Sequence, residues 1–480
     1  MSQFFQIQDI GAITPELELV AFGMFLLIFD LLIPDKRKLG LIALGGIAIS
    51  GLFLFRLRNT DFSAYGGVLA LDPFSIFFKS IFLIAAALSI AISLKYLDIE
   101  RENHGEYYAL ILFATVGMMF MAGAVDLVTL YIGLETMAIA TYILVGFLRS
   151  NQRSNEASMK YFLLGAFSSG ILLYGMSLLY GLSGSTRFVD IAEALSRRPL
   201  TDPISMMAMI TLSAGMFFKV AAVPFHQWTP DAYEGAPTSI TAFMSVAVKA
   251  ASFAMMVRIF MVAIYPLRPQ WLPIMAAVSV MTMTIGNIAA ITQSNVKRML
   301  AYSSISHAGY ILIGFIAGNE TGLTAVPLYL FIYTFTNLGA WAVIVALRRK
   351  DVIGDQIDDM AGLFFRHPSG AVLMLIFLLS LAGIPPTAGF IGKYYLFAAA
   401  IQTGHNTLAV IAVLNAAISI YFYFRIVVSM FMREATEKTG LVYAPGLTMT
   451  LAIATLFTLL IGVYPDPFIA MARQAVILGF

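Results

Sequence analysis

The chain has 480 residues, of which 60% are hydrophobic and only 12% are charged. A soluble protein of this size carries roughly twice that share of charge, so the composition excludes a soluble globular protein. The absence of cysteine excludes disulfides, thiolate zinc sites and cysteine-ligated iron–sulfur clusters within the chain, and the net charge of +2 gives no indication of nucleic-acid binding.

Apolar stretches of about twenty residues recur along the chain, and this is the length that a helix needs to cross a bilayer. Backbone groups in hydrocarbon must find their hydrogen bonds inside each segment, so we expect an all-α polytopic membrane protein. The N-terminus has no basic segment before an apolar core, and no cleaved signal peptide is expected. About fourteen transmembrane helices are predicted, at 15–33, 39–56, 73–95, 107–123, 125–148, 159–181, 203–223, 237–263, 271–292, 299–318, 321–347, 370–400, 405–432 and 446–472.

Loop charges predict the orientation of these helices. Loops after odd-numbered segments, such as 34–38, 149–160, 294–298 and 348–356, hold about sixteen Lys and Arg, against about seven in the other loops and the termini. By the positive-inside rule the former loops lie in the cytoplasm. With an even number of segments, both termini are then expected on the outer side.

An internal repeat divides the chain. TYILVGF at 141–147 recurs as GYILIGF at 309–315, and each copy lies in the second segment of a five-segment block, 107–263 or 271–432. Because five is odd, successive blocks must have opposite orientations, as in the inverted repeats of transporters. Chance similarity between apolar helices is the alternative. The remaining parts are a three-helix N-terminal segment and a C-terminal helix, at 1–100 and 446–480.

Corresponding helices of the two blocks are predicted to be interrupted. In the first block Pro224 and Pro230 fall within FFKVAAVPFHQWTPDAYEGAPTS, and in the second Gly383, Pro385 and Pro386 fall within LAGIPPTAGF. Proline removes a backbone donor and disfavours helix at the residue before it, so both stretches are expected to unwind. Unwound backbone at membrane depth lines paths for water and ions, and the paired breaks therefore indicate transport.

Seven ionisable residues lie deep in apolar segments, and four of them, Glu135, Lys219, Lys249 and Lys393, are the main candidates for a proton pathway. Placing one such residue in mid-membrane costs ~2.5–3.5 kcal/mol, and such residues usually face a protein interior and serve ion or proton pathways. Glu135 and Lys219 can both stay charged if they face each other. This pair is either part of a proton pathway or a structural ion pair that orients two helices.

The other two lysines have no acidic neighbour that the sequence can identify. Lys249 is nearly central in its segment, with no acidic residue within two helical turns. It is either a proton relay, since an unpaired lysine in an apolar setting readily exchanges its proton, or the partner of an acid on another helix. Lys393 follows the second break and is either the outlet of a proton path or a lysine that extends towards the membrane surface.

Two histidines and one further lysine are additional candidates. His226 directly follows the first break, and His307 shares its segment with Ser303 and Ser304. Histidine titrates near physiological pH, so each ring either relays a proton or is a packed, hydrogen-bonded group. Lys160 begins the sixth segment and either couples to the interior or extends to the surface.

Other chemistry finds little support in the sequence. Lys79 lies one heptad after Asp72, so we expect it to be structural. The five histidines show no metal-ligand spacing, and no GxGxxG motif follows a strand. We therefore expect no metal and no bound cofactor in this chain.

Several of these stretches together resemble one family, the antiporter-like membrane subunits of respiratory complex I, which are related to Mrp-type cation/proton antiporters. The resemblance covers the whole chain, and its most specific motifs are LYIGLETMAIATYILVGF, KVAAVPFHQWTPDAYEGAP, AVKAASFA and LAGIPPTAGFIGKYYLF. The chain is most similar to the N type, whose start resembles PELELVAFGMFLLIFDLL. No lateral-helix extension like that of the L type is expected, and Lys393 stands where the M type typically has a glutamate.

The resemblance implies a fold and a pathway. The fold of this family has two inverted five-helix bundles with discontinuous helices, each bundle forming a half-channel. Glu135 and Lys219 are implied to be the pair whose separation changes the proton affinity of the lysine. Lys249 is implied to be the central relay, and Lys393 the outlet towards the outer side.

The implied activity is proton translocation within a type I NADH:quinone oxidoreductase, a translocase whose redox chemistry takes place in other subunits. Quinone, FMN and iron–sulfur clusters are expected in partner subunits. The expected partners are membrane subunits of the A, H, J, K, L and M types, the peripheral NADH-oxidising arm and the lipid of a bacterial inner membrane. The alternative is an Mrp-like Na⁺(K⁺)/H⁺ antiporter subunit that is not attached to a redox enzyme.

Overall fold

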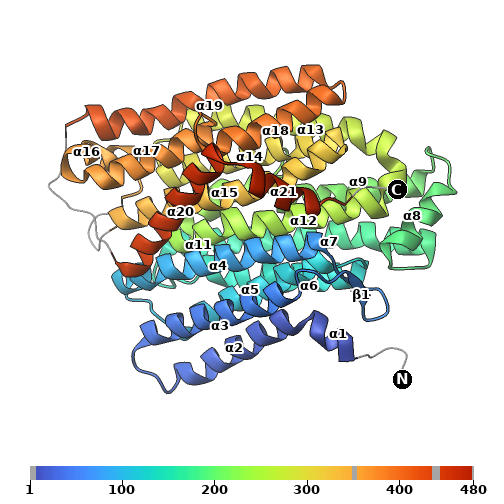
Figure 1. The fold of residues 1–480 in the computed structure, drawn as a ribbon, viewed down its shortest axis with the longest axis horizontal. Coiled ribbons are helices and arrows are strands. Elements are labelled where there is room, and N and C mark those ends of the chain that lie inside the picture. Colours follow the sequence, from blue (N-terminus) through green and yellow to red (C-terminus); the bar gives the residue numbers. More distant parts are fainter. Residues whose placement is uncertain (1–6, 349–353, 435–443, 478–480) are drawn as a thin grey trace.

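The computed structural model describes residues 7–348, 354–434 and 444–477. Long helices lie side by side with roughly parallel axes (Figure 1). The described residues also form one short antiparallel β-hairpin, which pairs β1 (Phe62–Ala64) with β2 (Leu69–Leu71). The expected all-α polytopic class is confirmed.

The N-terminal segment forms four helices and the hairpin. Asp35 and Asp72 cap α3 and α4 by accepting hydrogen bonds from backbone N–H groups of the first turn. The helices are α1 (Ile7–Ala12), α2 (Thr14–Asp30), α3 (Lys36–Arg56) and α4 (Pro73–Glu100).

The first predicted block contains three long helices, a short surface helix and an interrupted helix. They are α5 (Gly105–Gly123), α6 (Leu127–Val145), α7 (Gln152–Ser183), α8 (Phe188–Ser196), α9 (Pro203–Lys219) and α10 (Trp228–Gly235). The last membrane helix is a continuous run made of α11 (Thr238–Phe243), a π-helical turn (Met244–Val248), α12 (Lys249–Arg258) and a second π-helical turn (Ile259–Ala263).

The second predicted block repeats this order, again with an interrupted fourth helix. After a 3₁₀ turn (Tyr265–Leu267) it contains α13 (Arg268–Ile291), α14 (Val296–Ala317), α15 (Glu320–Leu347), a 3₁₀ turn (Ile357–Met360), α16 (Leu363–Arg366), α17 (Pro368–Ala382), α18 (Ala388–Gln402) and α19 (Asn406–Met432). The C-terminal helices are α20 (Pro445–Val463) and α21 (Asp466–Gln474). The proposed inverted relation of the blocks and their boundaries remain predictions.

The predicted number of spans is not confirmed. Among the described residues, eleven helices are long and apolar enough to cross a membrane, and Pro203–Lys219 and Pro368–Ala382 are shorter apolar helices. The predicted total of about fourteen is reached only if α2 and each of the two interrupted helices count as one further span. The orientation also remains a prediction, and residues 349–353 of the basic loop 348–356 lie outside the described residues, as do both chain ends, 1–6 and 478–480.

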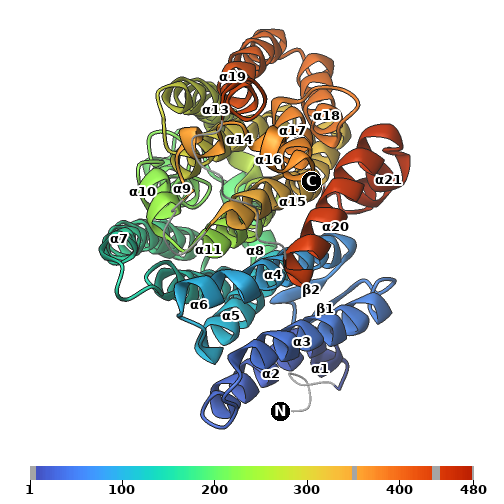
Figure 2. The same cartoon turned by 90° about the vertical axis from the view of Figure 1, so that its left-hand side faces the viewer.

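Three helices form the centre of the bundle. The most apolar windows of Thr238–Ala263, Val296–Ala317 and Glu320–Leu347 are each 94% buried. Figure 2 shows α15 and α11 inside the bundle, with α2 and α3 at one margin and α19 at the opposite margin. Polar side chains on these central helices are therefore shielded from lipid by the rest of the chain.

Candidate functional site

The first interrupted helix carries one of the predicted lysines at its break. α9 ends at Lys219 and α10 begins at Trp228, so the unwound stretch is 220–227 and contains Pro224. Pro230 is not in this stretch, contrary to expectation. It lies in the first turn of α10, where the missing N–H removes no helical hydrogen bond.

The second interruption lies between α17 and α18. Gly383 ends α17 with φ +83°, a left-handed conformation that glycine adopts without a Cβ clash. Pro385 and Pro386 follow within the unwound stretch, and α18 begins at Ala388. Both interruptions contain a cis proline, at Pro224 and at Pro386.

Lys219 and Glu135 do not form the predicted ion pair in this structure. Lys219 is 6% exposed, and its ammonium donates to Ser169 Oγ on α7 at 3.2 Å. Glu135 is half-buried on α6, and its Oε1 makes no hydrogen bond with the described residues. Within the described residues, no ion pair or hydrogen bond joins the two groups.

Lys249 lies at the centre of the bundle without a carboxylate partner in the described ranges. It is 3% exposed and begins α12 directly after the π-helical turn Met244–Val248. Its ammonium donates to both the backbone oxygen and the hydroxyl of Ser304 on α14, and lies 5.8 Å from the ring centre of Tyr333. The acid on another helix that the alternative interpretation requires is not found among the described residues, and neutral oxygens hold this lysine.

Lys393 lies next to the second interruption, facing the end of the helix before it. It is 4% exposed and donates to the carbonyl oxygens of Leu381 at 3.1 Å and Ala382 at 2.8 Å. These are the last carbonyls of α17, where a cation also meets the negative end of the helix dipole. Tyr310 lies beneath the ammonium, with 5.0 Å to the ring centre. The lysine is therefore held inside the protein, not extended to the membrane surface.

The ring of His307 contacts two tyrosines that also lie next to these lysines, Tyr333 beside Lys249 and Tyr310 beside Lys393. The ring is 4% exposed, with Nδ1 2.6 Å from the Tyr329 hydroxyl and Nε2 3.1 Å from the Tyr423 hydroxyl. Ser303, beside the Ser304 that binds Lys249, shares a hydrogen bond with Tyr423. Serine, tyrosine and histidine groups thus lead from Lys249 towards Lys393.

Sequence reasoning missed the tyrosines of this region. Tyr329 and Tyr333 are one helical turn apart on α15, and Tyr310 and Tyr423 come from α14 and α19. Each is buried. Tyrosines spaced four apart in an otherwise apolar helix were an available signal, but the same pattern is also common in packed cores.

His226 lies in the first unwound stretch and is half-buried. In the described part of the chain it takes part in no ion pair, and no contact joins its ring to Lys219. Its proposed role as a relay stays a prediction.

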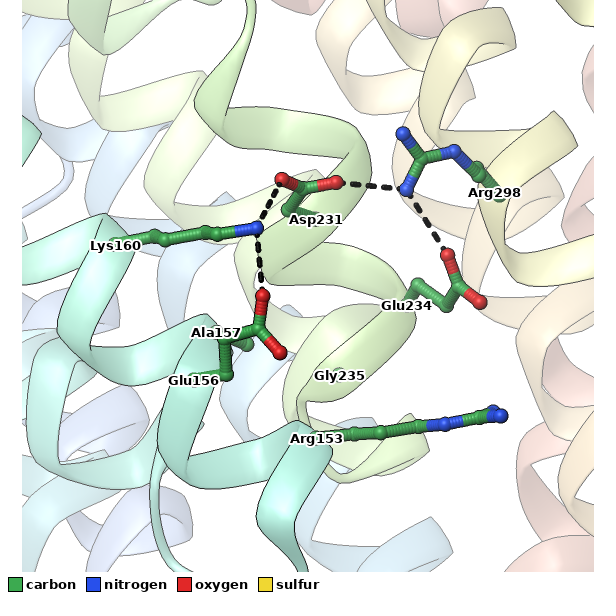
Figure 3. A pocket seen from close by; sticks show the side chains of 8 residues that line it. All are labelled: Arg153, Glu156, Ala157, Lys160, Asp231, Glu234, Gly235 and Arg298. Atoms are coloured by element: carbon green, nitrogen blue, oxygen red, sulfur yellow. Dashed lines mark hydrogen bonds and ion pairs between the residues drawn. The ribbon is translucent and has the colours of Figure 1, made fainter.

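Lys160 belongs to a charged cluster at one end of α10, shown in Figure 3. Its side chain is 44% exposed and pairs with Glu156 at 2.8 Å and with Asp231 at 2.9 Å. Arg298 binds the other oxygen of Asp231 at 2.7 Å and Glu234 at 3.0 Å. These residues border a cavity of about 270 Å³. Lys160 thus lies at the rim of a charged cavity instead of inside the bundle.

The ion pairs of this cluster connect α10 to helices of both predicted blocks. Lys160 comes from α7 of the first block and Arg298 from α14 of the second. Burial raises the pKa of Asp231, but the hydrogen bonds and charges of Arg298 and Lys160 outweigh this effect and hold the pKa below its usual range. Asp231 therefore stays ionised at neutral pH and keeps both cations in place.

Lys79 has a different partner from the one the sequence suggested. It pairs with Glu16 on α2 at 2.6 Å, and both side chains are buried. Asp72 instead binds both terminal nitrogens of Arg258 at 2.8 Å. Heptad spacing along α4 could not reveal either partner, because both lie on other helices. Lys79 is structural in the sense expected, since it joins α4 to α2.

No group of His, Asp and Glu that could hold a metal ion occurs among the described residues. The buried polar residues around Lys249, His307 and Lys393 are tyrosines and serines, which together with these three side chains exchange protons or hydrogen bonds. The arrangement is suited to moving protons.

Comparisons with known proteins agree with this arrangement. The family described as "NADH:quinone oxidoreductase/Mrp antiporter, TM" matches residues 124–419, more than half of the chain. This range contains both interruptions and all four predicted buried charges. The fold and the site thus define an antiporter-like membrane subunit.

Relatives that match the full chain narrow this class. NADH-quinone oxidoreductase subunit N 2 of Solibacter usitatus is 52% identical over 99% of each chain. NADH-quinone oxidoreductase subunit N of Trichlorobacter lovleyi is 46% identical, again over 99% of each chain. The chain belongs to the NADH-quinone oxidoreductase subunit N family.

Solved structures share the fold. A chain of respiratory complex I from Thermus thermophilus with bound aureothin has a TM-score of 0.82 at 30% identity, covering 96% of this chain and 99% of that one. A chain of the Mrp complex from a Dietzia strain has a TM-score of 0.85 at 21% identity, covering 98% of this chain and 97% of that one. The second similarity concerns the fold alone.

Proposed function

We propose that this chain is a proton-translocating membrane subunit of a type I NADH:quinone oxidoreductase in a bacterial inner membrane. The observation that carries the proposal is the set of buried lysines linked through His307 and its tyrosines, within a chain of the subunit N family. Electron transfer from NADH to quinone, with its FMN and iron–sulfur clusters, takes place in partner subunits. The proposed partners are the A, H, J, K, L and M type membrane subunits and the peripheral arm.

The proposed pathway starts at Glu135 and Lys219. A change in a neighbouring subunit alters the distance between these two groups and thereby the charge on Lys219. The present geometry, with Lys219 on Ser169, is the separated form of the pair. Charges couple strongly only over several ångströms at an effective dielectric of ~20, so the effect reaches Lys249 through intervening water and polar groups.

From Lys249 the proton passes through Ser304 and the His307 region to Lys393, and from there to the outer side. Each of the two lysines donates to neutral oxygens, which can hydrogen-bond an ammonium or an amine. The site can therefore hold either lysine in both protonation states. The unwound stretch beside Lys393 is the proposed point of release.

A freestanding Mrp-like cation/proton antiporter is the less supported function. Relatives at 40–52% identity over nearly the whole chain carry the name of an NADH-quinone oxidoreductase subunit, whereas the Mrp chain is similar in fold at 21% identity. Copurification of flavin and iron–sulfur subunits with this chain tests the assignment, and sodium-sensitive exchange without them would contradict it.

Substitution of Lys249 tests the pathway. Lys249→Ala and Lys249→Arg should each lower coupled proton uptake at least about tenfold, because alanine has no titratable group and arginine does not release its proton. The measurements are NADH:quinone turnover and proton uptake in proteoliposomes. Copurification of the other subunits checks assembly, and normal pumping by assembled Lys249→Ala complexes would rule out the pathway.

A further inference from the structure

A groove runs along α4 on the side opposite the first predicted block, between α3 and the C-terminal helices. It contains two cavities. One, of about 670 Å³, lies between α3, α4 and the start of α20, and the other, of about 550 Å³, lies between α3, α4 and α21. Figure 2 shows α20 and α3 on either side of α4. Neither cavity contains a residue of the proposed proton pathway.

The two cavities lie along one face of each helix. The lining residues of α3 recur at helical spacing and are Arg37, Leu41, Leu44, Gly51, Leu54 and Phe55, and Arg58 follows just beyond the end of this helix. Those of α4 do the same and include Phe77, Ser80, Ile84, Ala91, Lys95 and Asp98. From Phe77 to Asp98 a helix rises ~30 Å, which matches the hydrocarbon thickness of a bilayer. The two cavities together therefore extend along α4 over a length that matches the thickness of a bilayer.

Basic side chains mark the ends of this apolar groove. Arg37 and Lys95 lie at the end predicted to face the cytoplasm, and Arg58 lies at the other end, against the ring of Phe55 at 4.0 Å. Arg37 pairs with Asp98 at 2.7 Å. Lys95 has no ion pair or hydrogen bond from its ammonium to any described residue. Among the described residues, the charge of Lys95 at the predicted headgroup level is therefore uncompensated.

The larger cavity is lined mainly by apolar residues. α20 lies directly against α4 at this end, where a Cβ on Gly446 would come within 2.6 Å of the Ala91 carbonyl oxygen. The space that remains is bounded by Leu41, Leu94 and Met449. Its apolar lining suits acyl chains, and a lysine that pairs with no described residue suits an anionic headgroup, as in basic pockets between membrane helices that bind acidic lipids.

We propose that the cavity between α3, α4 and α20 binds an anionic phospholipid of the inner leaflet. The lipid phosphate lies between Lys95 and Arg37, and the acyl chains extend along α4 between Leu41 and Met449 towards the second cavity. α20 begins at the same end without a side-chain cap on Ala444, so its helix dipole adds to the attraction of the two basic side chains. The lipid fastens the C-terminal helix to the N-terminal segment.

Photo-crosslinking in the intact complex tests the proposal. A benzophenone side chain placed at Met449 is irradiated in membranes that contain phosphatidylglycerol, and the peptide that carries it is examined by mass spectrometry. The expected product is a phosphatidylglycerol adduct. Lys95→Gln should lower its yield about fivefold, the effect of one basic residue on binding to acidic lipid.

Lys38→Gln is the matched control, since Lys38 is exposed near the same end of α3 but does not line the cavity. It should leave the adduct unchanged. An adduct to another protein subunit, the absence of any lipid adduct, or equal yields with Lys95→Gln and with the wild type would each overturn the proposal. Membranes containing phosphatidylcholine in place of phosphatidylglycerol should give little product.

Discussion

Each buried lysine of the proposed pathway is held by neutral oxygens in place of a carboxylate. Lys219 donates to a serine, Lys249 to another serine, and Lys393 to the last carbonyls of a helix. A carboxylate would favour the ammonium form strongly. A hydroxyl or carbonyl accepts a hydrogen bond from the ammonium or from the neutral amine, so these contacts position the nitrogen without fixing its protonation state.

The Tyr423 hydroxyl is the best single group with which to test the link between Lys249 and Lys393. It contacts both Ser303 and the His307 ring. Tyr423→Phe removes this hydroxyl and little volume, and the loss of ~1 kcal/mol in hydrogen bonding should lower turnover about fivefold. NADH:quinone turnover and proton uptake in proteoliposomes measure the effect.

Tyr421→Phe is a control on the same helix, because Tyr421 is 60% exposed. Its turnover should equal that of the wild type. If Tyr423→Phe matched this control in fully assembled complex, the hydroxyl would have no part in the path.

At the scale of elements, the interruptions place side chains where a continuous helix could not. The unwound stretch after α9 begins directly after Lys219, and the stretch after α17 exposes the carbonyls of Leu381 and Ala382 to Lys393. An irregularity of another kind, the π-helical turn Met244–Val248, directly precedes Lys249. Asn337 donates a 2.7 Å hydrogen bond to Ser245 in this turn. Helix irregularities of this kind are frequent at functional sites.

Gly383→Ala tests the second interruption. The backbone there has φ +83°, and an added Cβ would approach the Lys393 Cδ to 2.7 Å. The strained backbone should cost ~1–2 kcal/mol. The flexible lysine can move aside, but its ammonium then leaves the helix end, so turnover should fall as well. The loss of stability is measured as a lower temperature at which this subunit dissociates from the purified complex.

Gly45→Ala provides the comparison for this substitution. An added Cβ at Gly45 meets nothing within 4 Å, and alanine favours a helix by ~1 kcal/mol over glycine. Gly45→Ala should therefore be neutral or stabilising. Equal behaviour of the two variants would contradict the assigned role of Gly383.

At the scale of the whole molecule, ion pairs join parts that are distant in sequence. Asp72, at the start of α4, binds Arg258 on the helix of Lys249, and Arg258 also donates to the Ala122 carbonyl at 3.0 Å. The charged cluster around Asp231 joins α7, α10 and α14. The N-terminal segment and both predicted blocks are thus held in one arrangement around Lys249.

Removing one partner from the Asp72–Arg258 pair should destabilise the subunit strongly. Arg258 is 3% exposed, and Arg258→Gln leaves a largely buried carboxylate unpaired, at a cost of ~3 kcal/mol. The double variant with Asp72→Asn should recover part of this loss. Thermal unfolding of the purified complex measures the stability of both variants. As a control, Arg197→Gln removes one member of an exposed ion pair and should change the stability by less than ~1 kcal/mol.

The pH dependence of this pair follows from the pKa of Asp72. Burial raises it, but the charge and hydrogen bonds of Arg258 outweigh burial and hold the pKa below its usual range. The stabilisation is therefore complete above the unfolded value of ~3.9 and is lost as the pH falls through the lower folded value. The loss of stability in Arg258→Gln should be the same at pH 6 and pH 8, and a strong change between them would contradict the assignment.

Much of the architecture could be predicted from the amino-acid sequence. Runs of apolar residues predict membrane helices, because the bilayer imposes both the length and the hydrogen bonding of each segment. Prolines and Gly383 mark the interruptions, and lone charges such as Lys249 are conspicuous where nearly every neighbour is apolar. These signals are local, so they do not depend on how the helices pack.

The partners of the charged residues depended on the tertiary structure. Lys79 binds Glu16 and not Asp72, Lys219 lies on Ser169 apart from Glu135, and Pro230 belongs to the helix that follows the break. A side chain on a buried helix faces one of several neighbouring helices. The sequence of one helix does not reveal how the neighbouring helix is rotated about its own axis, and so which of its side chains face the first helix.

By itself, the sequence determined that this protein is a polytopic helical membrane protein with two broken helices and a set of buried lysines. Only the tertiary structure decided what those lysines contact, because hydrogen bonds between helices form at distances of about 3 Å that depend on packing. Tyrosines and serines that look like core residues in the sequence become a connected series around His307, and a groove bounded by α3, α4 and α20 appears only when helices from both ends of the chain come together.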